Sequence, residues 1–394
     1  MISILLLVGI LVSMFVGFNI GGSTTGPAFG PAVGAKAISK PLAAFLMTGF
    51  FFVGGWTLGR RVVDTLGNEL VTNPDIFTLE ASIGVLFFIG LALFIGNMFG
   101  VPASTSMTAV GAIAGLGFAR DALDWAVLGE IATWWLVAPV IGFWVSLIIG
   151  RYFYARLHAL IAMERTSGDL LAVDRSGPIP IPRAADNTNR KELIGTVTVI
   201  VIGCLMAFSS GTSNVANAIA PLVGSGVIEM NPAIILGCIA VGIGAFTIAR
   251  RTLDTMGSDI TELPLTAAII VAIVSASLVI FLSAIGIPAS FVVIATMSII
   301  GLGWGRATRP LTVPEAVRGE ENVEVSVGGL AADEEHDADE VPAIGEEEPE
   351  DIPSASDLFD PGTTARVVLM QNVVPMLATV GAFLTFRFVP IFGF

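Results

Sequence analysis

Two stretches of the chain place neutral hydrogen-bonding side chains among apolar residues. Residues 21–34 read GGSTTGPAFGPAVG, and residues 211–224 read GTSNVANAIAPLVG. Hydroxyl and amide groups donate hydrogen bonds, and glycine lets a ligand approach the backbone closely. Neither stretch contains lysine, arginine or histidine, so uncharged donors would hold any anion bound there. This residue chemistry predicts a site that captures and releases a small anion.

A shorter polar phrase follows each of these stretches. Residues 100–106 read GVPASTS, and residues 286–290 read GIPAS, with Phe291 and Val292 where the first copy has hydroxyls. Proline interrupts a helix, and the hydroxyls after it can line a cavity. We therefore predict one shared central site. Its expected lining is Ser23, Thr24, Thr25, Ser104, Thr105, Ser106, Thr212, Ser213, Asn214, Asn217 and Ser290.

The elements that must position these residues are membrane helices. Hydrophobic residues make up 54% of the 394 residues and charged residues only 13%. A soluble domain carries roughly 25% charged residues. Apolar stretches of about 20 residues, each long enough to cross a bilayer, recur along the chain. The composition predicts an all-α, multi-pass protein of the cell membrane.

A charged motif shows that the membrane unit is duplicated. GGWTLGRRVVDTLG at 54–67 recurs as GAFTIARRTLDTMG at 244–257. Duplicated units with matching glycine-rich breaks are typical of secondary transporters. The repeated charges predict either structural ion pairs at helical spacing or anion attraction at the two mouths. These charges belong to Arg60, Arg61, Asp64, Arg250, Arg251 and Asp254.

The repeats and the polar segments divide the chain into five parts. Residues 1–150 form the first membrane repeat, and 151–192 form a polar, basic loop that we place in the cytoplasm. The first part of the second membrane repeat covers 193–304. An acidic insert at 305–362, whose composition predicts disorder, separates this part from a last transmembrane helix at 363–394.

The charge distribution also predicts the orientation of the repeats. The N-terminus has no positive charge and is expected outside, whereas the central loop is expected inside, so each repeat needs an odd number of crossings. Four long spans per repeat would require one hairpin to add a crossing. We expect a polytopic helical bundle of two inverted repeats with broken or re-entrant helical hairpins. Helices restarting at 21–34 and 211–224 would direct their positive ends at the anion.

The site segments resemble those of the inorganic phosphate transporter (PiT) family. GTSNVANAIAP at 211–221 is similar to that family's GANDVANA-like signature. GVPASTSM at 100–107 and GIPASFVV at 286–293 are similar to its GLPVSTTH-like phrase. The resemblance covers both repeats and leaves out the acidic insert. The resemblance implies an anion symporter whose central site is built from both halves, and it implies a homodimer.

Several residues depart from the family pattern. Thr24 and Asn214 stand where the signature has aspartate, and Met107 and Val293 stand where the phrase has histidine. Hydrogenphosphate gains from an acceptor such as a carboxylate, whereas sulfate needs only donors. Phosphate is the expected substrate from the family resemblance. Sulfate or another oxyanion, or an uncoupled anion channel, is the alternative.

Cation coupling has fewer candidate residues. We expect Na⁺ rather than H⁺, since both histidines lie in predicted loops. The candidates are Thr24, Asn214, Asn217, Glu80 and Glu130. No P-loop and no Cys, His or carboxylate constellation with catalytic spacing occurs, so an enzyme is not expected. No cofactor other than Na⁺ and no nucleic-acid partner is expected.

Overall fold

The computed structural model describes residues 4–34, 37–98, 104–161, 171–174, 181–184, 190–248, 265–307 and 361–389. The first half holds α1 (Ile4–Gly34), α2 (Lys40–Trp56), α3 (Gly59–Asp64), α4 (Leu79–Met98), α5 (Thr105–Ala119), α6 (Trp125–Ile148) and α7 (Tyr154–Ile161). The second half holds α8 (Arg190–Gly224), α9 (Met230–Thr247), α11 (Leu265–Ala284), α12 (Phe291–Ala307) and α15 (Pro361–Phe388). Shorter helical segments are η1 (Thr65–Glu69), η2 (Pro74–Ile76) and η3 (Ile149–Phe153).

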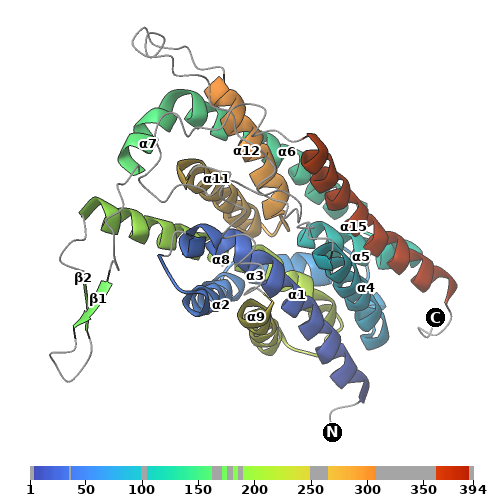
Figure 1. Cartoon of the computed structure of the whole chain (residues 1–394). Coiled ribbons are helices and arrows are strands. Elements are labelled where there is room, and N and C mark those ends of the chain that lie inside the picture. Colours follow the sequence, from blue (N-terminus) through green and yellow to red (C-terminus); the bar gives the residue numbers. More distant parts are fainter. Residues whose placement is uncertain are drawn as a thin grey trace.

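These helices form a membrane-type bundle (Figure 1). Six helices in the described ranges are long and apolar enough to cross a bilayer. Helix α2 and the segment formed by α3 and η1 are bent by 64° and count as a seventh span if taken together. The predicted all-helical, multi-pass architecture is confirmed. A small antiparallel hairpin of β1 (Leu171–Asp174) and β2 (Ile181–Ala184), which the sequence did not predict, lies in the central loop.

The two halves pack through each other. Helix α1 lies against α9, and α2 lies against α8 in the same way. Glycines stand at both crossings, at Gly21 and Gly244 in one and at Gly54 and Gly211 in the other. A Cβ atom at any of these four positions would lie within 2.1 Å of a carbonyl oxygen on the facing helix. The backbones therefore touch, as small residues allow between membrane helices.

This packing corrects one prediction. Both α1 and α8 run without interruption through the glycine-rich stretches, although α1 includes Pro27 and Pro31 and α8 includes Pro221. The glycines serve close helix packing and do not break the helices. The breaks fall at the second pair of phrases, where α5 begins after Ser104 and α12 begins after Ser290, as the prolines predicted.

Helices α1 and α8, which begin the two halves, run antiparallel. The Ser13 hydroxyl of α1 donates to the Ala218 carbonyl of α8 at 2.7 Å. Further along α1, Phe29 packs beside Gly203, which lies earlier in α8. Contacts that advance along α1 thus go backwards along α8.

The hairpin of α4 and α5 returns to the side from which it started. The segment before α4 pairs with the segment after α5: the Thr72 amide donates to the Ala122 carbonyl at 2.8 Å, and the Asp124 amide donates to the Leu70 carbonyl at 3.0 Å. We expected a hairpin to add a crossing, but this hairpin adds none.

The hairpin of α11 and α12 also starts and ends on one side of the bundle, but on the side opposite to the ends of the first hairpin. His158 of α7 lies 3.1 Å from the Thr266 hydroxyl at the start of α11. At the end of α12, Gly305 packs on the Leu147 carbonyl near the end of α6. Since α6 begins beside the ends of the first hairpin and finishes beside the ends of the second, the two hairpins enter the bundle from opposite ends.

Candidate functional site

A group of polar side chains, all buried except the half-buried Thr105, lies where α5, α8 and the turn before α12 meet. We call Thr105, Ser106, Ser213, Asn214 and Asn217 the central polar cluster. The three members on α8 are spaced by one, three and four residues, which places them on one helical face. Ser106, Ser213 and Asn217 are at most 1% exposed. All five were predicted site residues, and the structure brings them together.

Ser213 joins the three elements. Its hydroxyl lies 3.1 Å from the Ser106 hydroxyl of α5. Both hydroxyls reach the carbonyl oxygen of Ala289, at 2.9 Å from Ser106 and 2.8 Å from Ser213. The Ala289 amide in turn donates to the Ser213 hydroxyl at 3.1 Å. Sequence reasoning missed Ala289 because it contributes only backbone atoms, and the residue type does not indicate where a backbone group will lie.

The two asparagines complete the cluster. Asn214 accepts hydrogen bonds at Oδ1 from the Thr105 hydroxyl and from Asn217 Nδ2, the latter at 3.1 Å. Its own Nδ2 donates to the Ser210 hydroxyl at 3.0 Å. Asn217 Oδ1 is buried and has no hydrogen-bond partner among the described residues. Leaving a buried acceptor unpaired costs about 1–3 kcal/mol, so this oxygen is available to a ligand.

Two helix starts converge on the cluster. Ser104 caps α5 by accepting the Met107 amide at 3.2 Å, and Ser290 accepts the Val293 amide of α12 at 3.4 Å. The first amides of a helix have no partner within it and carry the positive end of the helix dipole. Anion-attracting helix ends are therefore present, but they belong to α5 and α12, whereas we predicted them in α1 and α8.

Besides the capping residues Ser104 and Ser290, four predicted site residues stay outside the cluster. Each hydroxyl donates to a carbonyl three or four residues earlier in its own helix, at 2.7–3.1 Å, as Ser and Thr often do inside helices. These residues are Ser23, Thr24, Thr25 and Thr212. The glutamates proposed for cation coupling also lie elsewhere: Glu80 and Glu130 are exposed near the first turns of α4 and α6.

The charged motif is only partly described. Arg60 donates through Nε to the Trp56 carbonyl at 2.7 Å, and its guanidinium lies 4.4 Å from the centre of the Trp56 ring. Arg61 donates through Nη1 to the carbonyl of Ala284 at the end of α11. The exposed Asp64 also lies close enough to Arg60 for their opposite charges to interact, as helical spacing suggested. Arg250, Arg251 and Asp254 lie outside the described residues.

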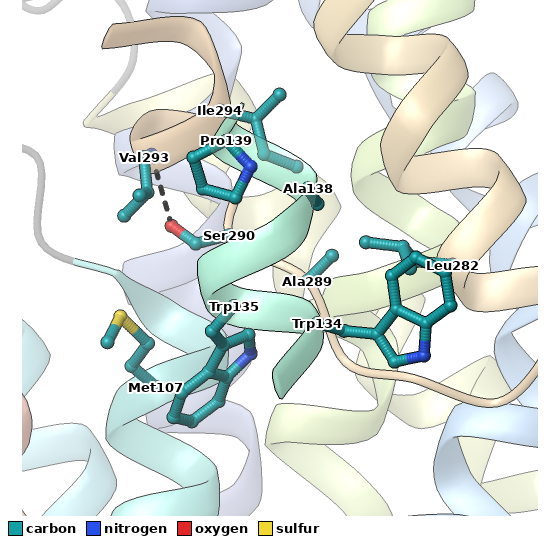
Figure 2. A pocket seen from close by; sticks show the side chains of 10 residues that line it. All are labelled: Met107, Trp134, Trp135, Ala138, Pro139, Leu282, Ala289, Ser290, Val293 and Ile294. Carbon is teal, nitrogen blue, oxygen red and sulfur yellow. Dashed lines mark hydrogen bonds between the residues drawn. The ribbon is translucent and has the colours of Figure 1, made fainter. Parts of the chain in front are cut away.

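A small apolar cavity adjoins the cluster (Figure 2). Its volume is about 30 Å³. Trp135 closes it on one side and donates through Nε1 to the Pro288 carbonyl at 2.8 Å. The space suits one or two waters and is too small for an oxyanion. Its lining comprises Met107, Trp134, Trp135, Ala138, Pro139, Leu282, Ala289, Ser290, Val293 and Ile294.

Comparison with known proteins assigns the family. Residues 20–329 match PHO4, the phosphate transporter family. The chain belongs to the phosphate transporter family. It is therefore a multi-pass membrane protein of a transporter family and not an enzyme. In the described ranges, no three His, Cys, Asp or Glu side chains gather in a way that could hold a metal ion.

Individual relatives in this family differ in their named substrates. The chain is 31% identical to the sulfate permease CysP of Bacillus subtilis, over 68% of this chain and 69% of that protein. It is 25% identical to a candidate phosphate permease of Thermococcus kodakarensis, over 70% of this chain and 83% of that protein. The fold is similar to a solved sodium-dependent phosphate transporter, with a TM-score of 0.67, 16% identity, and coverage of 99% of this chain and 100% of that chain.

Proposed function

We propose that this chain is a secondary transporter that binds a tetrahedral oxyanion at the central polar cluster. The observation that carries the proposal is the position of Ser213, which links the starts of two helices from different halves. Hydroxyl, amide and helix-end N–H donors converge there without a fixed positive charge. Such a site binds an anion with moderate strength and can release it on the other side.

Alternating access follows from inverted repeats, which we include in the proposal. The antiparallel α1 and α8 support this arrangement, as do hairpins that enter from opposite ends of α6. The halves correspond to residues 1–150 and 193–394, the second half containing the acidic insert. Each hairpin tip would then be freed toward its own side of the membrane in turn.

Sulfate is the substrate that the donor set favours. Sulfate carries no proton near neutral pH and offers only acceptor oxygens, which suits a cluster built from Ser, Thr and Asn side chains. The similarity to a sulfate permease points the same way. Phosphate is the second candidate, because a protonated phosphate oxygen could donate to Asn214 Oδ1 or to the Ala289 carbonyl.

A cation is the proposed coupling partner, with Na⁺ preferred to H⁺. No member of the cluster titrates near neutral pH, so proton coupling through it has no carrier. Asn217 Oδ1 supplies an unpaired buried oxygen, and uncharged oxygens can coordinate Na⁺ in transporters of this kind. Asn214, the other coupling candidate in the cluster, already accepts two hydrogen bonds.

Uptake into proteoliposomes tests the proposal. Radiolabelled sulfate should accumulate above its equilibrium level under an inward Na⁺ gradient, and excess phosphate should compete more weakly than molybdate or unlabelled sulfate. Uptake that stops at equilibrium under every cation gradient would indicate an uncoupled channel. Strong competition by phosphate and arsenate alone would identify phosphate as the substrate.

A further inference from the structure

An open apolar groove lies between α5, α6 and α15, which are neighbours in Figure 1. Its volume is about 330 Å³. Phe118 forms its centre, packing 5.2 Å from the Phe383 ring and edge-on to Trp125 at 6.1 Å. Phe118 is 50% exposed and Trp125 is 65% exposed, so the groove opens to the surroundings of the bundle. In a membrane protein those surroundings are lipid.

Two arginines stand at one end of this groove. Arg120 directly follows α5, and Arg387 lies in the last turn of α15. Arg387 donates through Nη1 to the Ala119 carbonyl at 3.5 Å, which holds it beside the end of α5. Burial first, and then the charge of Arg387, lower the pKa of Arg120 below its usual value. The two positive charges are therefore close enough to repel each other.

Two acidic residues lie in the turn after Arg120, and they differ in how far they can compensate the charge of the arginines. The Asp124 carboxylate caps α6 by accepting the amides of Ala126 and Val127, at 2.9 and 3.1 Å. Asp121 is exposed and has a positive φ of 52°, a conformation set by the turn. Asp121 is thus the competing anion for the arginines.

We propose that the groove and the arginine pair Arg120–Arg387 bind one anionic phospholipid. An acyl chain would fill the groove, and the headgroup phosphate would accept hydrogen bonds from the two guanidinium groups. Guanidinium groups match phosphate oxygens in geometry as well as charge. Each basic residue near a membrane surface adds about 1 kcal/mol of attraction to anionic lipid, so two arginines favour it by roughly tenfold or more.

The second half supplies a matched control. Arg306 ends α12 as Arg120 follows α5, but its guanidinium lies 3.7 Å from the centre of the Tyr154 ring. A cation held over an aromatic ring is already partly compensated. Replacing Arg306 should therefore leave binding at the α5–α15 groove unchanged.

Native mass spectrometry of the full-length protein tests the site with dioleoyl phosphatidylglycerol and dioleoyl phosphatidylcholine. The wild type should bind one phosphatidylglycerol at least about tenfold more tightly than phosphatidylcholine. The double variant Arg120→Gln/Arg387→Gln should lose this preference, whereas Arg306→Gln should keep it. Arg120→Lys/Arg387→Lys should also keep most of it and so controls for folding. Asp121→Asn should strengthen it.

A groove variant separates the acyl chain from the charges. Val380 lines the groove and is 43% exposed, so Val380→Trp should fill the space and reduce phosphatidylglycerol binding with both arginines present. Equal binding of the two lipids by the wild type would overturn the proposal, as would an undiminished preference in the double glutamine variant. A Val380→Trp protein that changes its oligomeric mass while its lipid binding stays the same would show instead that a second copy covers the groove.

Discussion

At the scale of single residues, Ser213 carries the largest share of the candidate site. Its hydroxyl meets Ser106 of α5 and both polar backbone atoms of Ala289. Each such hydrogen bond contributes about 1 kcal/mol. We expect Ser213→Ala to raise the Michaelis constant for uptake about tenfold, measured by initial rates in proteoliposomes.

Ser225 is the matched control for this substitution. Its hydroxyl donates only to the Leu222 carbonyl at the end of the same helix, at 2.7 Å. Ser225→Ala should change the Michaelis constant by less than about twofold, since it removes one local bond. Equal losses in the two variants would mean that the effect of Ser213→Ala is one of general stability.

Asn214 is the residue that should set substrate preference. Asn214→Asp places a carboxylate where the site now has an amide. An ionised carboxylate repels sulfate, which has no proton to donate, but it can accept a hydrogen bond from the hydroxyl of hydrogenphosphate. We expect sulfate uptake to fall at least tenfold and the ratio of phosphate to sulfate uptake to rise, measured by paired tracer assays.

Asn214→Leu separates lost bonding from added charge. It removes both hydrogen-bonding groups at similar volume, so uptake of both anions should fall together. If Asn214→Asp behaves like Asn214→Leu, the carboxylate does not discriminate between the two anions.

The sequence identified the polar members of the cluster but assigned the lining too widely. Hydroxyl and amide side chains in apolar stretches are recognisable, and the five cluster members were among those predicted. Whether a helical hydroxyl points into a site or back to its own helix depends on its rotamer, which residue type does not determine. Thr25 and Thr212 therefore looked the same in the sequence as Ser213.

At the scale of elements, the structure agrees with the predicted breaks at the GxPAS phrases but not with those at the glycine-rich stretches. The GxPAS phrases predicted the starts of α5 and α12 correctly. Proline alone did not decide this, because Pro27, Pro31 and Pro221 lie inside unbroken helices. The glycine-rich stretches were assigned as breaks, yet α1 and α8 continue through them. A glycine that permits a turn and a glycine that permits close packing are the same letter, and only the facing helix distinguishes them.

The glycine contacts between helices give a stability prediction. In Gly54→Ala the new Cβ would lie 2.1 Å from the Phe208 carbonyl oxygen, so α2 and α8 must separate. Such overpacking costs about 1–3 kcal/mol. We expect the melting temperature of the purified protein to fall by several degrees, measured by differential scanning fluorimetry.

Gly49 provides the comparison within the same helix. Nothing lies within 4 Å of a Cβ atom placed there. Gly49→Ala should leave the melting temperature unchanged or slightly raised, because alanine favours the helical conformation by up to about 1 kcal/mol. A fall as large as that of Gly54→Ala would show that helix contacts do not explain the loss.

At the scale of the whole molecule, the returning hairpins determine the topology. The segments before α4 and after α5 are bonded to each other, so Asp75→Cys and Ala126→Cys should react with a membrane-impermeant maleimide from the same side. Arg156→Cys, in α7 beyond the other end of α6, should react only from the opposite side. The native Cys204 and Cys238 are buried and would be replaced by alanine to remove background labelling.

Opposite labelling of the Asp75 and Ala126 positions would mean that α4 and α5 cross the membrane an odd number of times. Hydropathy could not decide this, because α4 is long and apolar enough to span. Duplication and composition were sufficient for the membrane class, whereas the path of each hairpin depends on contacts between distant segments. Residues 308–360 of the predicted acidic insert lie outside the described residues. Its predicted ends belong to helices, since α12 extends to Ala307 and α15 begins at Pro361.

The crossings at Gly21, Gly54, Gly211 and Gly244 constrain how this molecule can move. They hold α1 against α9 and α2 against α8, backbone against backbone. Neither half can therefore move away as a rigid body without separating these contacts. We therefore expect α1, α2, α8 and α9 to stay together. The hairpins would move with the helices that pack on them, α5 with α15 and α12 with α6. The expected boundary between moving and fixed helices therefore does not coincide with the boundary between the two repeats.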